Sequence, residues 1–190
     1  IYMGDWSSDV CSSDLSVKEQ IVETASRLFY EQGYNATGIN QIIAEAKVAK
    51  ASLYQYFPSK EDLLAEYLTQ EAARTMESLF KEVARHDNVP AKINAIFDNL
   101  GRTIRKSEFQ GCQFLNIVSE IPVANKRIRL LIQKQKNDIR QLFKSILKEA
   151  KKQHLADEFY LLFEAALITG KVHQADWTIK AAKNMAAKLL

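Results

Sequence analysis

The sequence has few of the residues that mark several large classes of protein. Its 190 residues include two cysteines, Cys11 and Cys112, which cannot form a framework of disulfides, so we expect a reducing compartment such as the cytoplasm. Six glycines lie too far apart for a phosphate-binding loop. No apolar run is long enough to span a membrane, and no basic-then-apolar leader precedes the first expected helix. These absences argue against secreted disulfide-rich, nucleotide-binding and membrane proteins.

No segment alternates between apolar and polar residues for long enough to form a strand, whereas apolar residues recur at helical spacing along most of the chain. Hydrophobic residues make up 47% of the sequence, which is enough for a substantial core, and the net charge is +3. We therefore expect an all-α fold of about nine helices. The expected helices cover approximately residues 16–32, 37–46, 49–57, 59–85, 90–104, 111–121, 124–153, 155–173 and 176–190.

The first fifteen residues differ from the rest. They repeat Ser-Ser-Asp around Val10 and Cys11 and have no helical period. We interpret residues 1–15 as a disordered or non-native leader, and we exclude Cys11 as a functional candidate on that ground. A capping box, Ser16 followed by Glu19, then begins the first helix, and Gly33 ends it.

Two short helices joined by a tight turn are expected between Thr37 and Pro58. Thr37 has a hydroxyl that can cap the first of them, and the segment Lys47–Ala49 is the expected turn. The second short helix ends before Pro58, and Ser59 can cap the next helix, with Asp62 three residues later. This arrangement is a helix-turn-helix, whose second helix enters the major groove of DNA.

The second short helix carries an unusual set of polar and aromatic side chains. Amide, hydroxyl and amino groups can bind base edges, and Tyr and Lys side chains can hold phosphates. The base-edge candidates are Asn40, Lys50, Ser52 and Gln55. The phosphate candidates are Thr37, Tyr54 and Lys60, and Tyr56 can act in either way. The alternative is a three-helix core unit with no role in DNA binding.

The segment from Val48 to Leu63, VAKASLYQYFPSKEDL, resembles the recognition-helix signature of the TetR family of transcriptional regulators. The resemblance implies an N-terminal helix-turn-helix domain, here residues 16–62, followed by a ligand-binding and dimerisation domain, residues 63–190. Ala51 stands where the family often has glycine, and we include it among the DNA-binding candidates. Lys47 replaces a glycine that is usual in the turn, at modest cost if its backbone stays out of the left-handed region.

The last two expected helices indicate self-association. Residues 159–168 are apolar at nearly every position, so this helix must be buried on more than one side. Ala165, Ala166, Thr169 and Gly170 are small and permit close approach of another helix. The resemblance implies a homodimer through these two helices, and the alternative is a monomer that encloses them.

The resemblance also implies that a small molecule binds inside the larger domain. The candidate ligand contacts are mostly apolar, which suits an apolar or aromatic ligand, although core packing explains the same residues equally well. They are Phe97, Leu100, Phe114, Ile117, Gln135, Ile139 and Phe163.

Cys112 follows Gly111 at an expected helix N-terminus, an environment that raises the thiolate fraction of a cysteine. A redox or electrophile sensor and a small packing residue are both consistent with this position. His154 with Asp157 and His173 with Asp176 lie at expected helix ends, so we favour capping over metal binding. No catalytic motif and no cofactor site accompany them, and we do not expect an enzyme.

We therefore expect a dimeric DNA-binding repressor, released from an inverted-repeat operator by a small, largely apolar ligand. An activator of the same fold, a regulator that answers to a protein partner, and an all-α ligand-binding protein or enzyme that only contains the helix-turn-helix shape are the alternatives.

Overall fold

The computed structural model describes residues 15–190, and the predicted leader with Cys11 lies outside these residues apart from Leu15. The described part contains α-helices, one short 3-10 turn and no strand, which confirms the all-α prediction. The helices are α1 (Val17–Glu31), α2 (Ile39–Ala46), α3 (Lys50–Tyr56), α4 (Lys60–Val83), α5 (Val89–Lys106), α6 (Gln113–Glu120), α7 (Lys126–Glu149), α8 (Ala156–His173) and α9 (Trp177–Leu189).

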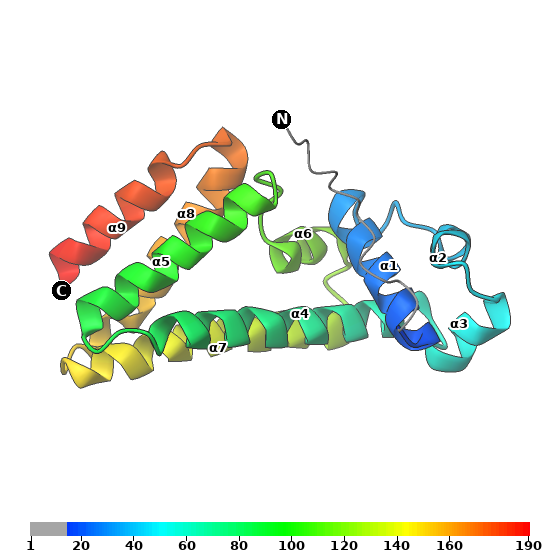
Figure 1. Ribbon diagram of the computed structural model, residues 1–190, viewed down its shortest axis with the longest axis horizontal. Helices are drawn as coiled ribbons and strands as arrows, with labels where there is room; N and C mark the ends of the chain where they lie inside the picture. The colour runs from blue at the N-terminus through cyan, green and yellow to red at the C-terminus, as the bar shows by residue number, and fades with distance from the viewer. Residues whose placement is uncertain (1–14) are drawn as a thin grey trace, which may run out of the picture.

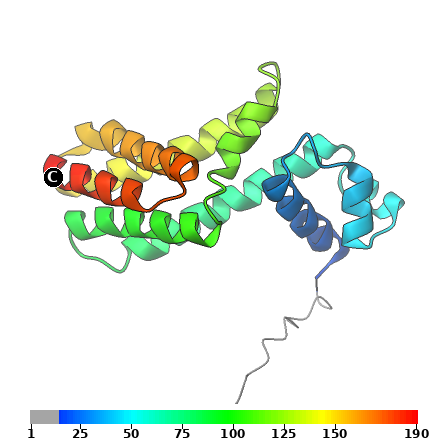
Figure 2. The ribbon, with the colours of Figure 1, turned by 90° about the horizontal axis from the view of Figure 1, so that it is seen from above.

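The molecule is elongated, with two long helices joining its ends (Figure 1). α4 and α7 pack side by side, α1 to α3 gather at one end of them, and α5, α8 and α9 form a bundle at the other (Figures 1 and 2). α6 lies between the two groups (Figure 1). α2 and α3 therefore lie far from the bundle, whereas α1 lies nearer to it (Figure 1).

The buried apolar residues form two clusters. One includes Leu28, Leu53 and Leu64 from the N-terminal helices, and it also takes in Phe114 of α6 and Ile132 of α7. The other fills the distant bundle around a group of tilted and edge-to-face aromatic rings, in which Phe143 lies near Phe97, Phe159 and Phe163. Because α6 packs into the N-terminal cluster, the helix-turn-helix segment does not close its core without help from later helices.

Local capping signals account for several helix starts. Ser16 Oγ accepts a hydrogen bond from the Glu19 backbone, and the Glu19 side chain accepts one from Ser16 N, so the capping box is confirmed. Ser59 caps α4 through Asp62 N, as predicted. The prediction for Thr37 is wrong. Gly38 is the N-cap of α2, and the Thr37 hydroxyl instead donates to the carbonyls of Leu28 and Gly33.

Two predicted core residues are exposed. Helical spacing places Phe80 of α4 and Met185 of α9 on the buried stripes of their helices, but each has more than half of its surface accessible. Helical spacing selects a stripe, and a residue at the edge of that stripe stays exposed where no neighbouring helix covers it. The end of α7 also differs from the prediction, because the helix stops at Glu149 and a turn with Lys151 at φ 58° leads to the 3-10 turn Gln153–Leu155.

Candidate nucleic-acid interface and ligand cavity

α3 is held in place by its apolar side. Leu53 is fully buried, and Phe57, which follows the helix, is almost fully buried. Phe57 N donates to the Leu53 carbonyl and closes the last turn. The opposite side of α3 has no covering element among the described residues, so its side chains face solvent at the outer end of the molecule (Figure 1).

The predicted DNA contacts divide into three groups by exposure. The exposed ones are Asn40, Lys50, Ala51, Tyr54, Gln55 and Tyr56, and both tyrosines have 43% of their surface accessible. Ser52 and Lys60 are half-buried. Thr37 is completely buried and hydrogen-bonded inside the protein, so its side chain is withdrawn as a phosphate contact. The rest form one exposed polar surface on α3 and its flanks, which we call the α3 face.

Lys60 stands at the first turn of α4, beside the loop that joins α1 to α2. Its Nζ lies 4.2 Å from the ring centroid of Tyr34, close enough for a cation–π interaction. Partial burial lowers the pKa of Lys60 and outweighs the opposite effect of Glu120. The contact with Tyr34 holds the ammonium group near the α3 face and reduces its freedom.

The turn between α2 and α3 contains backbone strain. Lys47, the C-cap of α2, has φ 54° and ψ 40°, which is the left-handed region. The condition under which lysine was expected to be tolerated here is therefore not met. A residue with a Cβ pays about 1–2 kcal/mol in this conformation, which glycine avoids. The strain explains why glycine suits this position of the turn.

α8 is apolar on two sides, and among residues 15–190 only one of these sides packs against other helices. Phe159, Phe163 and Gly170 face the bundle, whereas Leu161, Ile168 and Val172 have at least half of their surface accessible. Trp177 and Met185 of α9 are also exposed. In water-soluble proteins, an exposed apolar surface of this kind is typical of an interaction site. We call these five side chains the α8–α9 face.

Two residues that were expected to sit between subunits are internal. Ala166 is buried, and a Cβ added at Gly170 would lie 3.4 Å from Thr178 Oγ1 and 3.5 Å from Ile104 Cδ1. Enlarging either residue would therefore disturb the fold of one chain before it affected any dimer. Ala165 is exposed and lies on the outward side of α8.

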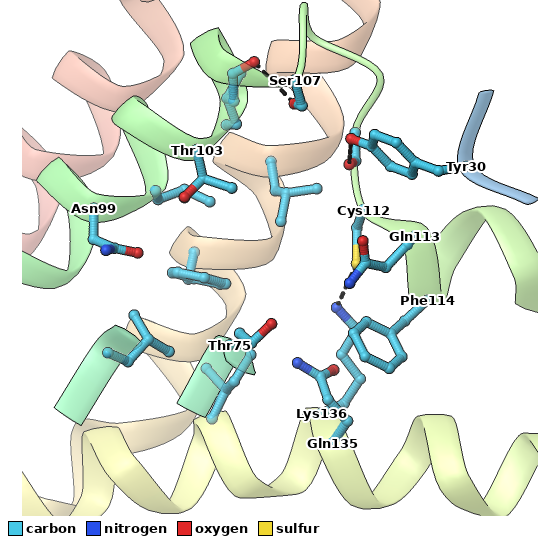
Figure 3. Close-up of a pocket in the computed structure, with 17 residues that line it drawn as sticks. Tyr30, Thr75, Asn99, Thr103, Ser107, Cys112, Gln113, Phe114, Gln135 and Lys136 are labelled. Atoms are coloured by element: carbon cyan, nitrogen blue, oxygen red, sulfur yellow. Dashed lines mark hydrogen bonds between the residues drawn. The ribbon is translucent and has the colours of Figure 1, made fainter. Parts of the chain in front are cut away.

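A cavity of about 110 Å³ lies among α4, α5, α6, α7 and α8 (Figure 3). Five of the predicted ligand contacts line it, namely Leu100, Phe114, Gln135, Ile139 and Phe163. Phe97 and Ile117 do not, because Phe97 packs in the bundle cluster and Ile117 in the N-terminal cluster. The lining also includes Thr75, Thr103 and Ser107, which were not predicted.

Cys112 lines the same cavity and contacts a buried ion pair. Lys136 Nζ lies 3.3 Å from Cys112 Sγ and 2.9 Å from Glu164 Oε1, and both charged side chains are only 12% exposed. Burial lowers the pKa of Lys136, but the Cys112 sulfur and the Glu164 carboxylate outweigh it and raise the pKa overall. This pair was not predicted from the sequence. Its signal was Glu164, a single acid within an otherwise apolar stretch, because a buried charge needs a partner.

The cavity also touches the N-terminal helices directly. Tyr30 of α1 lines it, and the Tyr30 hydroxyl donates a 3.0 Å hydrogen bond to the Gly111 carbonyl (Figure 3). Gly111 belongs to the loop between α5 and α6, in which Glu108 and Phe109 also have positive φ angles. A side chain of α1, which packs against α2 and α3, thus forms part of the cavity wall.

The far end of α6 makes a second link to the same segment. Glu120, the last residue of α6, accepts a 2.7 Å hydrogen bond from the Asn35 backbone, and the Asn35 amide donates to the Glu120 carbonyl. α6 therefore joins the cavity, through Phe114, to the loop that precedes α2.

None of the described helices is long and apolar enough to cross a membrane.

Comparison with known proteins gives a consistent result. Residues 21–67 match the family described as bacterial regulatory proteins, tetR family. An uncharacterised HTH-type transcriptional regulator of Bacillus subtilis, YxaF, is 41% identical over 81 residues, which is 42% of this chain and 42% of that protein. LmrA, another HTH-type regulator of B. subtilis, is 44% identical over 69 residues, or 32% of this chain and 37% of LmrA. These matches span less than half of the curated relatives' own length.

Solved structures extend the likeness of fold to most of the chain. A TetR-family transcriptional regulator from Streptomyces coelicolor is similar with a TM-score of 0.84 and 22% identity, over 91% of this chain and 93% of that one. The reduced form of E. coli NemR is similar with a TM-score of 0.81 and 19% identity, over 92% and 97% of the two chains. The helix-turn-helix segment, the sequence match over it and the fold of the described residues agree, and together they support a TetR-family regulator.

Proposed function

We propose that the chain binds double-stranded DNA through the α3 face and regulates transcription there. The observation that carries this proposal is the α3 face itself. A short helix anchored by Leu53 presents amide, amino and phenolic groups to solvent, inside the segment that matches the family. Such a helix fits the major groove. Regulation of this kind would place the protein in the cytoplasm, where the chromosome lies.

Within the α3 face, position and side-chain chemistry suggest different roles. Asn40, Lys50, Ser52 and Gln55 are the proposed base contacts. Lys60 and Tyr54 are the proposed phosphate contacts, and Tyr56 can serve either role. Ala51 allows the helix to approach the groove closely because its side chain is small.

Selection of bound sequences from a random pool of duplex DNA tests the proposal. The protein should enrich one sequence, and Lys60→Ala should weaken binding to all sequences alike while reducing the salt slope by about one unit per half-site. Lys148→Ala, at an exposed lysine near the far end of α7, is the matched control and should leave binding unchanged. Failure to enrich any sequence, or equal effects of the two variants, would contradict the proposal.

The α8–α9 face supports a homodimer. A second copy that covers Leu161, Ile168 and Val172 would form a four-helix bundle around a two-fold axis. Two α3 helices would then be related by the same axis. The enriched DNA should be an inverted repeat with half-sites about 34–36 Å apart, or a multiple of that spacing.

We further propose that the protein represses transcription until a small molecule occupies the cavity. α4 runs from the helix-turn-helix segment to the cavity, while Tyr30 and Glu120 provide shorter links. A ligand that favours one arrangement of these contacts changes the spacing of the two α3 faces. A coupling of about 1–3 kcal/mol weakens DNA binding by about 5–150-fold.

Reciprocity gives the test of this mechanism. If a ligand weakens DNA binding, DNA must weaken ligand binding by the same factor. A candidate ligand from a screen for DNA release is therefore titrated with and without the selected DNA. Equal ligand affinities in the two titrations would eliminate release by the ligand and would leave DNA binding intact.

The contact between Lys136 and Cys112 favours a second mechanism for releasing the DNA, in which Cys112 is oxidised. The Lys136 ammonium group places a positive charge 3.3 Å from Cys112 Sγ in the cavity wall. Attack of the Cys112 sulfur, as its anion, on a peroxide oxygen forms a sulfenic acid and breaks the O–O bond, so that the sulfur is oxidised and the peroxide is reduced to hydroxide. The added oxygen would enlarge the side chain beside the Gly111 loop.

Hydrogen peroxide added to a complex with the selected DNA tests this alternative. Release of DNA from the parent protein, with Cys112→Ser still bound, would support a redox sensor. Release from both proteins, or from neither, would leave Cys112 as a packing residue of the wall.

A further inference from the structure

Gln135 differs from the other polar side chains of the cavity wall. It lies in the middle of α7, is 2% exposed, and its Oε1 has no hydrogen-bond partner among residues 15–190. The two other carboxamides of the wall each form a hydrogen bond through the side-chain nitrogen. Asn99 donates to Ser78 Oγ and Gln113 donates to Glu71 Oε2.

A buried carbonyl oxygen without a partner is costly and rare in folded proteins, so the position of this one is informative. The Gln135 side chain extends from α7 toward the cavity, below Cys112 and beside Phe114 (Figure 3). Gln135 also borders the open groove between α4 and α7, but its low exposure keeps the amide away from bulk solvent. The cavity wall therefore includes one strong and buried acceptor, Gln135 Oε1, that no described residue uses.

The rest of the wall sets the size and the body of a ligand. Leu100, Phe114, Ile139 and Phe163 provide aliphatic and aromatic surfaces. The volume is about 110 Å³. An apolar cavity of about 150 Å³ holds a benzene molecule, so this smaller cavity limits the body of a ligand to about one six-membered ring at most.

The charges near the cavity cancel each other. Lys136 is the charged side chain in the wall, and Glu164 neutralises it at 2.9 Å. An ionised ligand would lose its hydration without gaining a free counter-charge, so an uncharged ligand is favoured.

We propose that the cavity binds an uncharged, ring-sized molecule with one hydroxyl group, which donates its hydrogen bond to Gln135 Oε1. This inference rests on the proposed role of the cavity as the effector site, and it names the class of effector. The apolar walls hold the ring, and Gln135 distinguishes a hydroxylated ring from a bare one, because only the hydroxylated ring satisfies the amide.

Three probes of similar size test the proposal on the whole chain without DNA. Phenol has the ring and the hydroxyl, toluene has the ring alone, and benzoate has the ring and a charge. Binding is followed by calorimetry and by ligand-observed NMR. We expect phenol to bind about tenfold or more tightly than toluene, and benzoate to bind least.

Two variants on the same helix identify the group responsible. Gln135→Leu removes the amide and should abolish the preference for phenol over toluene. Gln133→Leu makes the same change at an exposed position of α7 and should retain the parent preference. Gln135→Met is a second, flexible replacement in case leucine disturbs the fold, which circular dichroism reports.

Equal binding of phenol and toluene to the parent, or an unchanged preference in both Gln135 variants, would overturn the proposal. Release of the selected DNA is measured separately. Phenol that binds through Gln135 without weakening DNA binding supports the ligand class and contradicts the cavity's role as an effector site. A ligand that releases the DNA equally from the parent and from the Gln135 variants supports the cavity's role as an effector site and contradicts the proposed ligand class.

Discussion

The outer faces of the molecule and its internal cavity place polar groups in opposite ways. On the α3 face, polar side chains from one short segment point into solvent, and the chain makes little use of them in folding. At the cavity wall, Lys136 contacts both Cys112 and Glu164, and these three largely buried side chains come from three separate elements. A substitution on an outer face should therefore change binding and leave folding intact, whereas a substitution in the cavity should change both.

The strongest test of this difference uses the α8–α9 face. Ile168→Glu should keep the helical fold, because Ile168 is half exposed, but it should place a charge between the two subunits. Loss of the second half-site contact should weaken binding to the full inverted repeat by about 10²–10⁴-fold. Ultracentrifugation and DNA titration measure both effects.

Val123→Glu is the matched control, since Val123 is 81% exposed in the segment between α6 and α7. It should remain a dimer with unchanged DNA binding. A monomeric Ile168→Glu protein that binds the full repeat undiminished would refute the dimer proposal.

The second largest effect is expected at the buried ion pair of Lys136 and Glu164, and it should appear in the free energy of unfolding. Glu164→Leu leaves Lys136 charged, desolvated and without its carboxylate, which costs about 3–5 kcal/mol of the free energy of unfolding. Adding Lys136→Met removes the stranded charge and should recover much of the loss. Urea unfolding of the single and double variants measures the two values. A single variant within about 0.5 kcal/mol of the parent would show that the pair is well hydrated.

A substitution on the α3 face should change DNA binding and leave the free energy of unfolding nearly unchanged. Gln55→Ala should relax the preference at one base pair by about 1–3 kcal/mol, because an amide matches one base edge better than the others. Its effect on the free energy of unfolding should stay within about 0.5 kcal/mol, since Gln55 is exposed. Equal losses on selected and random DNA would assign Gln55 to the phosphate contacts instead.

The smallest effect concerns the strained turn. Lys47→Gly removes the left-handed strain and should stabilise the protein by about 1 kcal/mol. Lys151→Gly is a matched control, because Lys151 also has a left-handed backbone, at φ 58°, but follows α7 at the far end. Both variants should raise the urea midpoint, and only Lys47→Gly should change DNA affinity. A destabilised Lys47→Gly protein would contradict this explanation.

The sequence predicted the helices well because their signals are local. Apolar spacing, Pro58, and the caps at Ser16 and Ser59 act within one or two turns. Thr37 shows the limit of such signals, since a hydroxyl before a helix also has carbonyl acceptors within reach that belong to the preceding helix. The end of α7 shows another. No glycine or proline stops it, and Lys152 instead reaches the Leu189 carbonyl, a contact between distant segments.

The cavity was predicted less completely, because its wall joins residues that are far apart in the chain. Helical spacing found five lining residues, four of them apolar and the fifth Gln135, since wall and core residues occupy the same stripe of a helix. The pair of Lys136 and Glu164 spans two helices, and sequence spacing cannot match its members. The same applies to Tyr30, which helical periodicity places in α1 without indicating what it touches.

The position of α6 has a consequence for engineering hybrid regulators. Phe114, Ile117 and Ile121 complete the apolar cluster that includes residues of α1 and α4. Tyr30 of α1 in turn lines the cavity beside Phe114. A graft that transfers the helix-turn-helix segment alone to another scaffold would leave this apolar surface facing a helix it did not evolve with. α6 and the segment should be exchanged together, as one cassette, if a hybrid is to combine the DNA preference of one protein with the ligand of another.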